Sequence, residues 1–274
     1  MLISYGLIPT EKTEKITRSL IPSGSMKHLW LMNVNGEISV STTEGNSVEI
    51  LVEKTLKTDI PGALKAGWQE VNLRVVEVPD GYLVYTDIPC TEIDMETKEI
   101  SYCQREEDYT FRMNYNVKVP AEWNLTLKNM NHGNIRTEGV RGDISVCHVN
   151  GSVSITGAAG SVDASTANGE LYVKYADPPV DGSSFKTLNG DIVLDVPGHL
   201  DATVDYKTML GNVYTNFSEV TESEILPVAT TDRSEGTSRY LLEVRPQIIF
   251  GRGGPGLSFE TLNGSIYIQN NHIQ

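Results

Sequence analysis

The sequence predicts an all-β protein built as a β-solenoid or β-helix-like stack, in which coils of 18–21 residues carry two strands each. Two observations predict this fold. A short cassette recurs along the chain: a glycine, a polar residue, Ile, Val or Leu, any residue, and usually another apolar residue. Full copies stand at residues 36–40, 142–146, 151–155, 169–173, 190–194 and 264–268. The glycines at 133, 142, 151, 160 and 169 are nine residues apart, and the steps to 190 and 211 are 21 residues each, a spacing typical of stacked repeats.

Each cassette predicts a tight corner followed by a strand. Asn precedes the glycine at positions 150, 168, 189 and 263, and Asn-Gly favours a turn because both residues tolerate positive φ. The second and fourth residues after the glycine share one face of the strand. Those positions are apolar: Ile144, Val146, Val153, Ile155, Leu171, Val173, Ile192, Leu194, Ile266 and Ile268. We therefore expect the coils to stack these side chains into a core, with right-handed crossovers as the default.

We expect one elongated β-domain over residues 1–274. Its N-terminal β part, residues 1–120, contains a first double cassette at 35–50 and an insertion. Its main coil stack occupies residues 121–274, and a second insertion, residues 216–256, interrupts that stack.

The first insertion begins with a loop at residues 58–62 and continues with a strand at 71–75. Residues 115–120 alternate in polarity and end at Pro120, a pattern that an edge strand tolerates. In the second insertion, residues 221–236 are expected to form a polar, mobile loop, and residues 240–244 a strand. The glycine-rich residues 251–256 predict a turn before the last coil.

The net charge of −14 and the pI near 4.8 disfavour nucleic acid and anionic membranes as partners. No stretch approaches the length of a membrane-spanning helix. Residues 1–9 are apolar without a basic lead, so no signal peptide is visible. A cytoplasmic protein and a chain whose leader was trimmed remain open.

The odd count of three cysteines argues against a disulfide framework. We expect free thiols at Cys90, Cys103 and Cys147. A bond between Cys90 and Cys103 across a loop is the alternative in an oxidising compartment. No second Cys or His stands at zinc-ligand spacing, and the cassettes lack the paired glycines of calcium-binding nonapeptides, so neither a metal nor another cofactor is expected.

The eight-residue segments beginning at Thr166, Thr187 and Thr261 resemble the T-x-N-G-x-I coils of the bacterial putative-adhesin family of uncharacterised domains. The resemblance covers roughly residues 28–268. It implies a solenoid-like fold, exposure on the cell envelope or secretion, and no catalytic residues to transfer. This chain departs from the pattern at Leu210 and His132, which stand where the corner Asn is expected, and in its missing export signal.

Glu170 and Asp191 both follow a cassette glycine, so in-register stacking would place their carboxyls about 5 Å apart. Such a pair would bind a cation or act as an acid/base couple. The simpler interpretation is two solvated corner side chains that splay apart.

Tyr172, Tyr214 and Tyr267 all stand three residues after a cassette glycine, on the expected outward face. Val193 is expected between Tyr172 and Tyr214. The row is a candidate stacking platform for sugar rings or a partner protein. The simpler interpretation is an apolar floor that the long insertions cover.

The first functional hypothesis is therefore a non-catalytic interaction or scaffold module, adhesin-like and exposed on the cell envelope, with an unknown protein or carbohydrate as its partner. The alternatives are a polysaccharide-acting enzyme with its acids near Glu170 and Asp191, and an intracellular regulatory β-domain.

Overall fold

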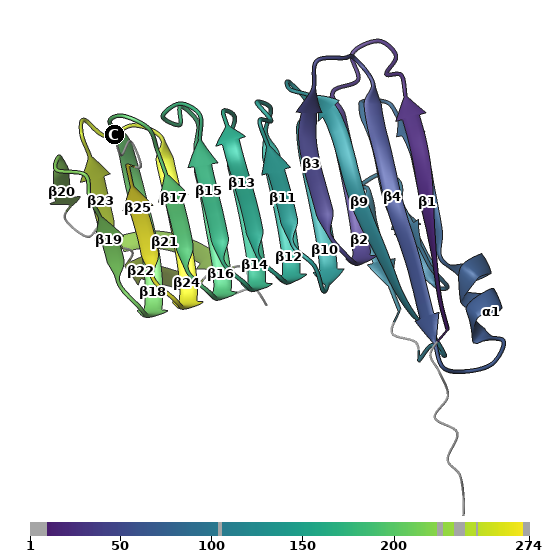
Figure 1. Ribbon diagram of the computed structural model, residues 1–274. Helices are drawn as coiled ribbons and strands as arrows, with labels where there is room; N and C mark the ends of the chain where they lie inside the picture. Colours follow the sequence, from purple (N-terminus) through teal and green to yellow (C-terminus); the bar gives the residue numbers. More distant parts are fainter. Residues whose placement is uncertain (1–9, 104–105, 224–226, 233–238, 245, 271–274) are drawn as a thin grey trace, which may run out of the picture. The chain divides into compact units, whose positions relative to one another are not determined.

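The computed structural model describes residues 10–103, 106–223, 227–232, 239–244 and 246–270. The chain divides into two compact units, Met1–Gly151 and Ser152–Gln274, called unit 1 and unit 2 below. Strands dominate both units, and α1 (Ala63–Glu70) is the one α-helix among the described residues (Figure 1). The all-β prediction is confirmed. The sheets mix parallel and antiparallel pairs, so the uniform stack expected from the sequence is not what forms.

Unit 1 contains two sheets that face each other across a core. Their strands are β1 (Thr10–Leu20), β2 (His28–Asn35), β3 (Ile38–Thr43), β4 (Val48–Thr58), β5 (Asn72–Val78), β6 (Gly81–Asp87), β9 (Thr110–Pro120), β10 (Asn124–Asn131), β11 (Ile135–Glu138) and β12 (Ile144–Asn150). Within this unit one sheet has the order β1-β4-β9-β3-β11, and the other has the order β5-β6-β2-β10-β12. Buried apolar side chains fill the space between them, among them Leu29, Leu31, Ile38, Val40, Ile50, Val117, Leu125 and Leu127.

A hydrogen-bonded chain of polar side chains crosses this core. The hydroxyl of Tyr115 on β9 lies 2.8 Å from the hydroxyl of Thr86 on β6, and the Thr86 hydroxyl donates to Oδ1 of Asn33 on β2 at 2.9 Å. All three side chains are buried. Since a buried polar group without a partner is costly, this chain fixes how the two sheets of unit 1 face each other.

The double cassette expected at residues 35–50 takes a different form. β3 pairs in parallel with β9 and β11, as a coil strand should, but β4 runs antiparallel to β9 and β1. Strand β9 contains the expected alternation up to Pro120 and lies between β4 and β3, so its assignment as an edge strand is wrong. Pro120 is tolerated there because it is the last residue of the strand, where few ladder bonds remain.

Helix α1 follows the expected loop at residues 58–62 and was not anticipated from the sequence, because Gly67 lies in its middle. The structure explains this glycine by a close approach. A Cβ at position 67 would lie 2.7 Å from Leu56 Cδ2 and from the ring of Tyr109, so only glycine lets the helix pack against β4. The strand expected at residues 71–75 is present as β5.

Strands β7 (Thr91–Asp94) and β8 (Glu99–Tyr102) form a hairpin over the outward face of β2 and β6. Ile93 and Ile100 of the hairpin, with Val76, pack on a cluster of Trp30, Met32, Val78, Leu83 and Tyr85. Both faces of β2 and β6 are consequently buried.

The same hairpin joins Cys90 and Cys103 in a disulfide with a Cα–Cα separation of 5.7 Å. The prediction of free thiols is therefore wrong for these two residues. The short, polar strands that bring them together carried no clear hairpin signal in the sequence. Cys147 is free and exposed.

Unit 2 also contains two sheets. Its strands are β13 (Val153–Ala158), β14 (Val162–Asn168), β15 (Leu171–Tyr175), β16 (Ser183–Asn189), β17 (Ile192–Asp195), β18 (Ala202–Leu210), β19 (Val213–Thr215), β20 (Val220–Ser223), β21 (Pro227–Asp232), β22 (Arg239–Val244), β23 (Gln247–Phe250), β24 (Gly256–Asn263) and β25 (Ile266–Gln269). Within this unit the order is β13-β15-β17-β25-β19 in one sheet and β14-β16-β24-β18-β23-β20 in the other. A separate antiparallel pair joins β21 and β22, so the strand expected at residues 240–244 is present.

The apolar cassette positions lie in the core, as the repeat predicts. Ile144 and Val153 are 2% and 1% exposed, and Leu171, Ile192 and Ile266 are fully buried. In unit 2 the cassette strands pair in parallel with like positions side by side, so Leu171 is opposite Ile192, and Ile192 is opposite Ile266. Glycine-opened corners and period-two alternation are therefore enough to place the core of these coils.

The order of the coils differs from their order in the sequence. The last coil, β24 and β25, lies between the coil of β16 and β17 and the coil of β18 and β19. Side-chain amides explain this order: Asn189 donates to Asn168 at 2.8 Å, and Asn263 donates to Asn189 at 2.7 Å. Leu210, opposite Asn263, has no amide with which to extend this asparagine ladder, so its coil lies at the ladder's end.

The recurring position of threonine within the Thr-x-Asn-Gly segments has an equally direct cause. Thr187 donates its hydroxyl to the carbonyl of Gly169 at 3.0 Å, and Thr261 donates to Gly190 at 3.1 Å. Thr208 makes the same bond to Gly264 at 3.0 Å. Each threonine thus ties its own coil to the corner of the neighbouring coil. In unit 1 the buried His148 takes this role, with Nε2 lying 2.8 Å from the carbonyl of Gly133.

The expected insertion at residues 216–256 contains β20 to β23. The polar loop expected at 221–236 lies partly outside the described residues, and its described parts are strands β20 and β21. Residues 251–255 form the expected turn before β24. In the part of the chain that the structure describes, none of the helices is long and apolar enough to span a membrane.

Candidate functional site

The three candidate tyrosines of unit 2 lie in one row on the outward face of a sheet. Tyr172 on β15 is opposite Val193 on β17, Val193 is opposite Tyr267 on β25, and Tyr267 is opposite Tyr214 on β19. The sequence predicts Val193 alone between Tyr172 and Tyr214. Because β25 of the last coil lies between β17 and β19, Tyr267 also separates these two tyrosines. We call Tyr172, Val193, Tyr267 and Tyr214 the tyrosine row.

The two ends of the tyrosine row differ in exposure and in contacts. Tyr214 is 48% exposed and stacks on Tyr267, with ring centroids 5.1 Å apart and an interplanar angle of 17°. The amide of Asn212 donates to the Tyr214 hydroxyl at 3.2 Å. This end presents a paired aromatic surface with a polar rim, which is the form that recognises sugar rings and apolar side chains.

At the other end, Tyr172 is anchored. Its hydroxyl donates to Oδ2 of Asp195 at 2.6 Å, and Gln269 donates to the other carboxylate oxygen at 2.7 Å. Burial, then the bond to Asp195 and the charge of that carboxylate, raise the pKa of Tyr172 to about 12. The buried Asp195 thus fixes one tyrosine, whereas Tyr214 remains available for contact.

The candidate carboxylates Glu170 and Asp191 belong to neighbouring coils, as expected, but their surroundings differ. Oδ1 of Asp191 accepts the backbone N–H of Ser265 at 2.7 Å. Two serine hydroxyls accept equivalent bonds at other corners. Ser152 accepts the backbone N–H of Glu170, and Ser265 accepts the backbone N–H of Asn212. Asp191 therefore holds a corner of the stack, while the side chain of Glu170 is exposed. Among the described residues, no cluster of three His, Cys, Asp or Glu side chains could hold a metal ion.

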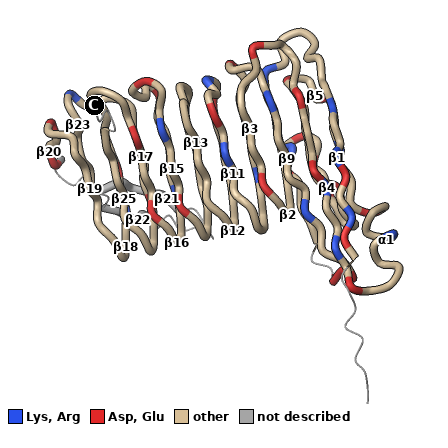
Figure 2. The backbone as a smooth tube through the Cα atoms, viewed as in Figure 1, with Lys and Arg blue, Asp and Glu red and all other residues tan. Residues whose placement is uncertain are grey.

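Sequence reasoning missed a second exposed apolar row in unit 2. Leu188, Leu262 and Met209 occupy adjacent strands β16, β24 and β18, each one residue after the threonine that bonds the neighbouring corner. Their exposures are 47%, 38% and 75%, and the following Leu210 is 70% exposed. The sequence signal that could have predicted this row is the leucine at the variable position of the Thr-x-Asn-Gly segments. Figure 2 shows how few charged positions lie on the cassette strands of unit 2, whereas β1 and β4 of unit 1 carry both signs and β9 carries basic residues.

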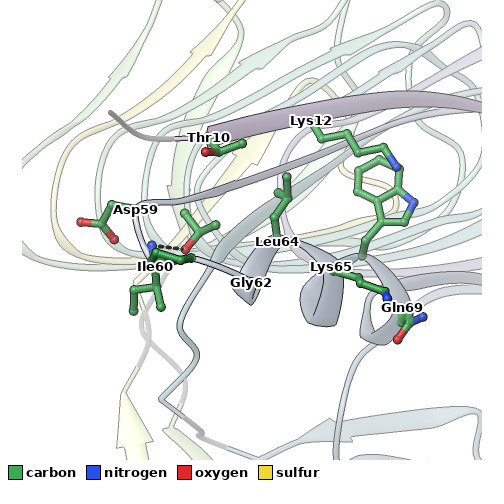
Figure 3. A pocket seen from close by; sticks show the side chains of 11 residues that line it. Thr10, Lys12, Asp59, Ile60, Gly62, Leu64, Lys65 and Gln69 are labelled. Carbon is green, nitrogen blue, oxygen red and sulfur yellow. Dashed lines mark hydrogen bonds between the residues drawn. The ribbon is translucent and has the colours of Figure 1, made fainter. Parts of the chain in front are cut away.

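Unit 1 contains a cavity of about 590 Å³, lined by β1, the end of β4, the loop after it and α1. Figure 3 shows Lys12 reaching in from β1, with Lys65 and Gln69 of α1 at the same end, while Asp59 and Ile60 lie at the opposite end. Leu64 and Trp68 supply apolar walls. The sequence did not predict this cavity, because residues 58–62 were expected only as a loop and the other lining residues come from an exposed edge strand and an unanticipated helix.

A buried lysine supports the helical wall of that cavity. Lys54 of β4 is 3% exposed and donates to the carbonyls of Trp68 at 2.8 Å and Val71 at 2.5 Å. These carbonyls belong to the end of α1, where a cation also complements the helix dipole. Burial lowers the pKa of Lys54, with the nearby Glu14 acting in the opposite direction.

No family model matches the chain, and no curated protein matches it. One similar solved structure is that of a putative cell adhesion protein from Clostridium sporogenes, 12% identical with a TM-score of 0.45, covering 95% of this chain and 100% of that one. Another is a putative adhesin from Bacteroides fragilis, 11% identical with a TM-score of 0.40, covering 94% of this chain and 97% of that one. The resemblance of the cassettes to a putative-adhesin family therefore stays a proposal.

Proposed function

We propose that this chain is a non-catalytic interaction module, adhesin-like in use, whose solenoid-like coils in residues 121–274 carry the contact surface. The single observation that carries the proposal is the tyrosine row. It places three aromatic rings and Val193 side by side on parallel strands, with Tyr214 48% exposed and stacked on Tyr267. A rigid, amphipathic surface of this kind loses little conformational entropy when a partner binds.

Two further observations support this function over its alternatives. Asp191 is engaged by a backbone N–H, which favours a structural role over half of an acid/base pair with Glu170. The Cys90–Cys103 disulfide favours an oxidising compartment, since such bonds are rare in the cytosol. We therefore propose a secreted or envelope-exposed protein that binds a protein or a carbohydrate.

The test is binding of the purified chain to panels of immobilised glycans and of purified extracellular proteins. We expect at least one saturable binder, and about tenfold or greater loss of affinity in Y214S/Y267S, because aromatic anchors contribute more than 1 kcal/mol each. The control is L51S, which removes a 39% exposed apolar side chain from β4 of unit 1. Equal loss in both variants, or hydrolysis of a glycan that E170Q abolishes, would overturn the proposal.

A further inference from the structure

The cavity beside α1 plays no part in the proposed function, and it has the features of a small-molecule site. Its volume of about 590 Å³ lies within the range of about 300–1,000 Å³ that such sites occupy. Its lining combines two kinds of wall. Ile60, Pro61, Leu64 and Trp68 are apolar, and Lys12, Lys65 and Asp59 are charged.

The charges of the cavity are separated along its length. Lys12 and Lys65 lie at one end, and Asp59 lies at the other (Figure 3). The chain as a whole carries a net charge of −14, so a pair of lysines at one end of an apolar cavity is a local reversal of sign. An anionic group is attracted to that end and repelled from the other, which orients a ligand that has one anionic terminus.

Trp68 fixes the cationic end. The ammonium of Lys12 lies 3.7 Å from the centre of the indole ring, and that of Lys54 lies 4.4 Å from it. Lys54 also holds the backbone of Trp68 through its carbonyl. The indole is therefore held from the β4 side, and it in turn positions Lys12 over the cavity by a cation–π contact.

We propose that this cavity binds a carboxylate with an elongated apolar body. The carboxylate pairs with Lys12, the positive charge of Lys65 favours the same end, and the apolar part lies along Leu64 toward Ile60. A small inorganic anion would leave the apolar walls in water, and a neutral apolar molecule would leave the two ammonium groups without a counter-charge. An amphipathic carboxylate is the class that satisfies both walls.

The test is titration of the full chain with dodecanoate below its micelle concentration, followed by calorimetry and by tryptophan fluorescence. We expect saturable binding at one site per chain. Because Trp30 and Trp123 are buried elsewhere, the fluorescence change should be lost in W68F. Dodecyltrimethylammonium, with the same tail and the opposite charge, should bind at least about tenfold more weakly, since the lysines then repel the head group.

Charge reversal provides the matched variants. K12E should weaken dodecanoate binding about fivefold to tenfold, and K12E/K65E further, because the lost ion pair accounts for up to about fivefold and the introduced carboxylate repels the ligand. K15E makes the same change of charge on the same strand, but Lys15 does not line the cavity. The affinity of the K15E variant for dodecanoate should therefore equal that of the wild type. Both substitutions are at exposed positions, and equal urea midpoints would confirm that neither unfolds the chain.

Three results would overturn the assignment: no saturable binding of dodecanoate, equal binding of the cationic amphiphile, or equal weakening by K12E and K15E. Self-association without dodecanoate that W68A abolishes would instead identify a second copy of the chain as the occupant. None of these results bears on the tyrosine row, so this inference and the proposed function succeed or fail separately.

Discussion

Units 1 and 2 use the same glycine-opened cassette but differ in what lies on the outward faces of their sheets. In unit 1 the β7–β8 hairpin covers β2 and β6, and outward positions of β1 and β4 set Glu11 opposite Lys57 and Lys15 opposite Glu53. In unit 2 the tyrosine row and the row of Leu188, Leu262 and Met209 remain exposed to differing degrees. Since both units bury the same cassette positions, the core repeat leaves the outward face free to vary. Unit 1 covers the face of β2 and β6 and places charges on β1 and β4, although Met130 and Val149 stay 39% and 40% exposed, whereas unit 2 leaves the tyrosine row and the leucine and methionine row open.

The largest effect should come from the corners, on which the coils of unit 2 depend most. Gly190 has φ +153°, and a Cβ there would overlap the carbonyl of Gly169 in the neighbouring coil. We expect G190A to lower the free energy of unfolding by about 3 kcal/mol or more, because the backbone atoms of Gly169 and Glu170 that the Cβ would meet cannot move away. Urea denaturation measures the change.

The control is G198A in the same unit, where φ is +72° but no atom lies within 4 Å of the added Cβ. It should lose only about 1 kcal/mol, from backbone strain alone. Similar losses in the two variants would contradict the close packing of the corners.

The second effect tests the cover of unit 1. Replacing both bonded cysteines in C90S/C103S frees a loop that the disulfide closes over a sequence separation of 13 residues. We expect a loss of about 2–3 kcal/mol, on the model in which the bond restricts the unfolded chain. When a reductant is added, the thermal unfolding midpoint of the wild type should fall to that of C90S/C103S. The midpoint of C147S should fall by the same amount as that of the wild type, because C147S keeps the disulfide. A wild type indifferent to reductant would show that the bond contributes nothing.

The third effect concerns the anchored end of the tyrosine row. Y172F removes one donor from the buried Asp195, so we expect a loss of about 1–2 kcal/mol below pH 10. The pKa of Tyr172 is raised from 10.0 to about 12, so the protonated phenol is favoured in the folded state. Its contribution is therefore complete below pH 10 and disappears as the pH rises from 10 to 12.

Urea denaturation of wild type and Y172F at several pH values checks this. The gap between the two proteins should narrow over that interval, and a constant gap would mean that the hydroxyl does not interact with Asp195 in the folded state. Y214F is the matched control, because Tyr214 lies at the exposed end of the row.

The smallest effect comes from the asparagine ladder of unit 2. At the corners of unit 1, Asn35 and Asn150 donate instead to the backbone carbonyls of Phe111 and Met130. N189A breaks both of its bonds and should cost about 1 kcal/mol, since the side chain is exposed. L210N adds an amide opposite Asn263 and should gain a few tenths to about 1 kcal/mol. Denaturation midpoints distinguish the two, and a destabilised L210N would show that Leu210 contributes apolar contact rather than merely ending the ladder.

The core of the coils was predictable because its signal is local. The burial of Ile144, Val153, Leu171 and Ile192 follows from their distance to a glycine and from strand alternation. The outward position of Tyr172, Tyr214 and Tyr267 follows from the same rule. Their neighbours across the sheet did not follow from it, because identical Thr-Leu-Asn-Gly segments at 187–190 and 261–264 can pair with each other as readily as with the next segment in sequence.

The features that sequence reasoning missed depend on contacts between distant residues. Gly67 argues against a helix until Leu56 and Tyr109 are seen to press against it. Cys90 and Cys103 meet only because two weakly patterned strands pair. In the sequence, Lys12 is one of several charged residues in the segment that forms β1. Its place in the cavity depends on its contact with Trp68, which the sequence does not show.

The intercalated last coil also has a consequence for synthesis. Because Thr261 bonds to Gly190 and Asn263 to Asn189, the place beside β16 belongs to a segment that is translated more than seventy residues later. Strands β18 and β19 emerge from the ribosome earlier, yet the strands with which they pair in parallel, β24 and β25, come later. A nascent chain that has passed residue 215 therefore exposes an open strand edge, which a chaperone must shield or a wrong neighbour can occupy, until β24 arrives.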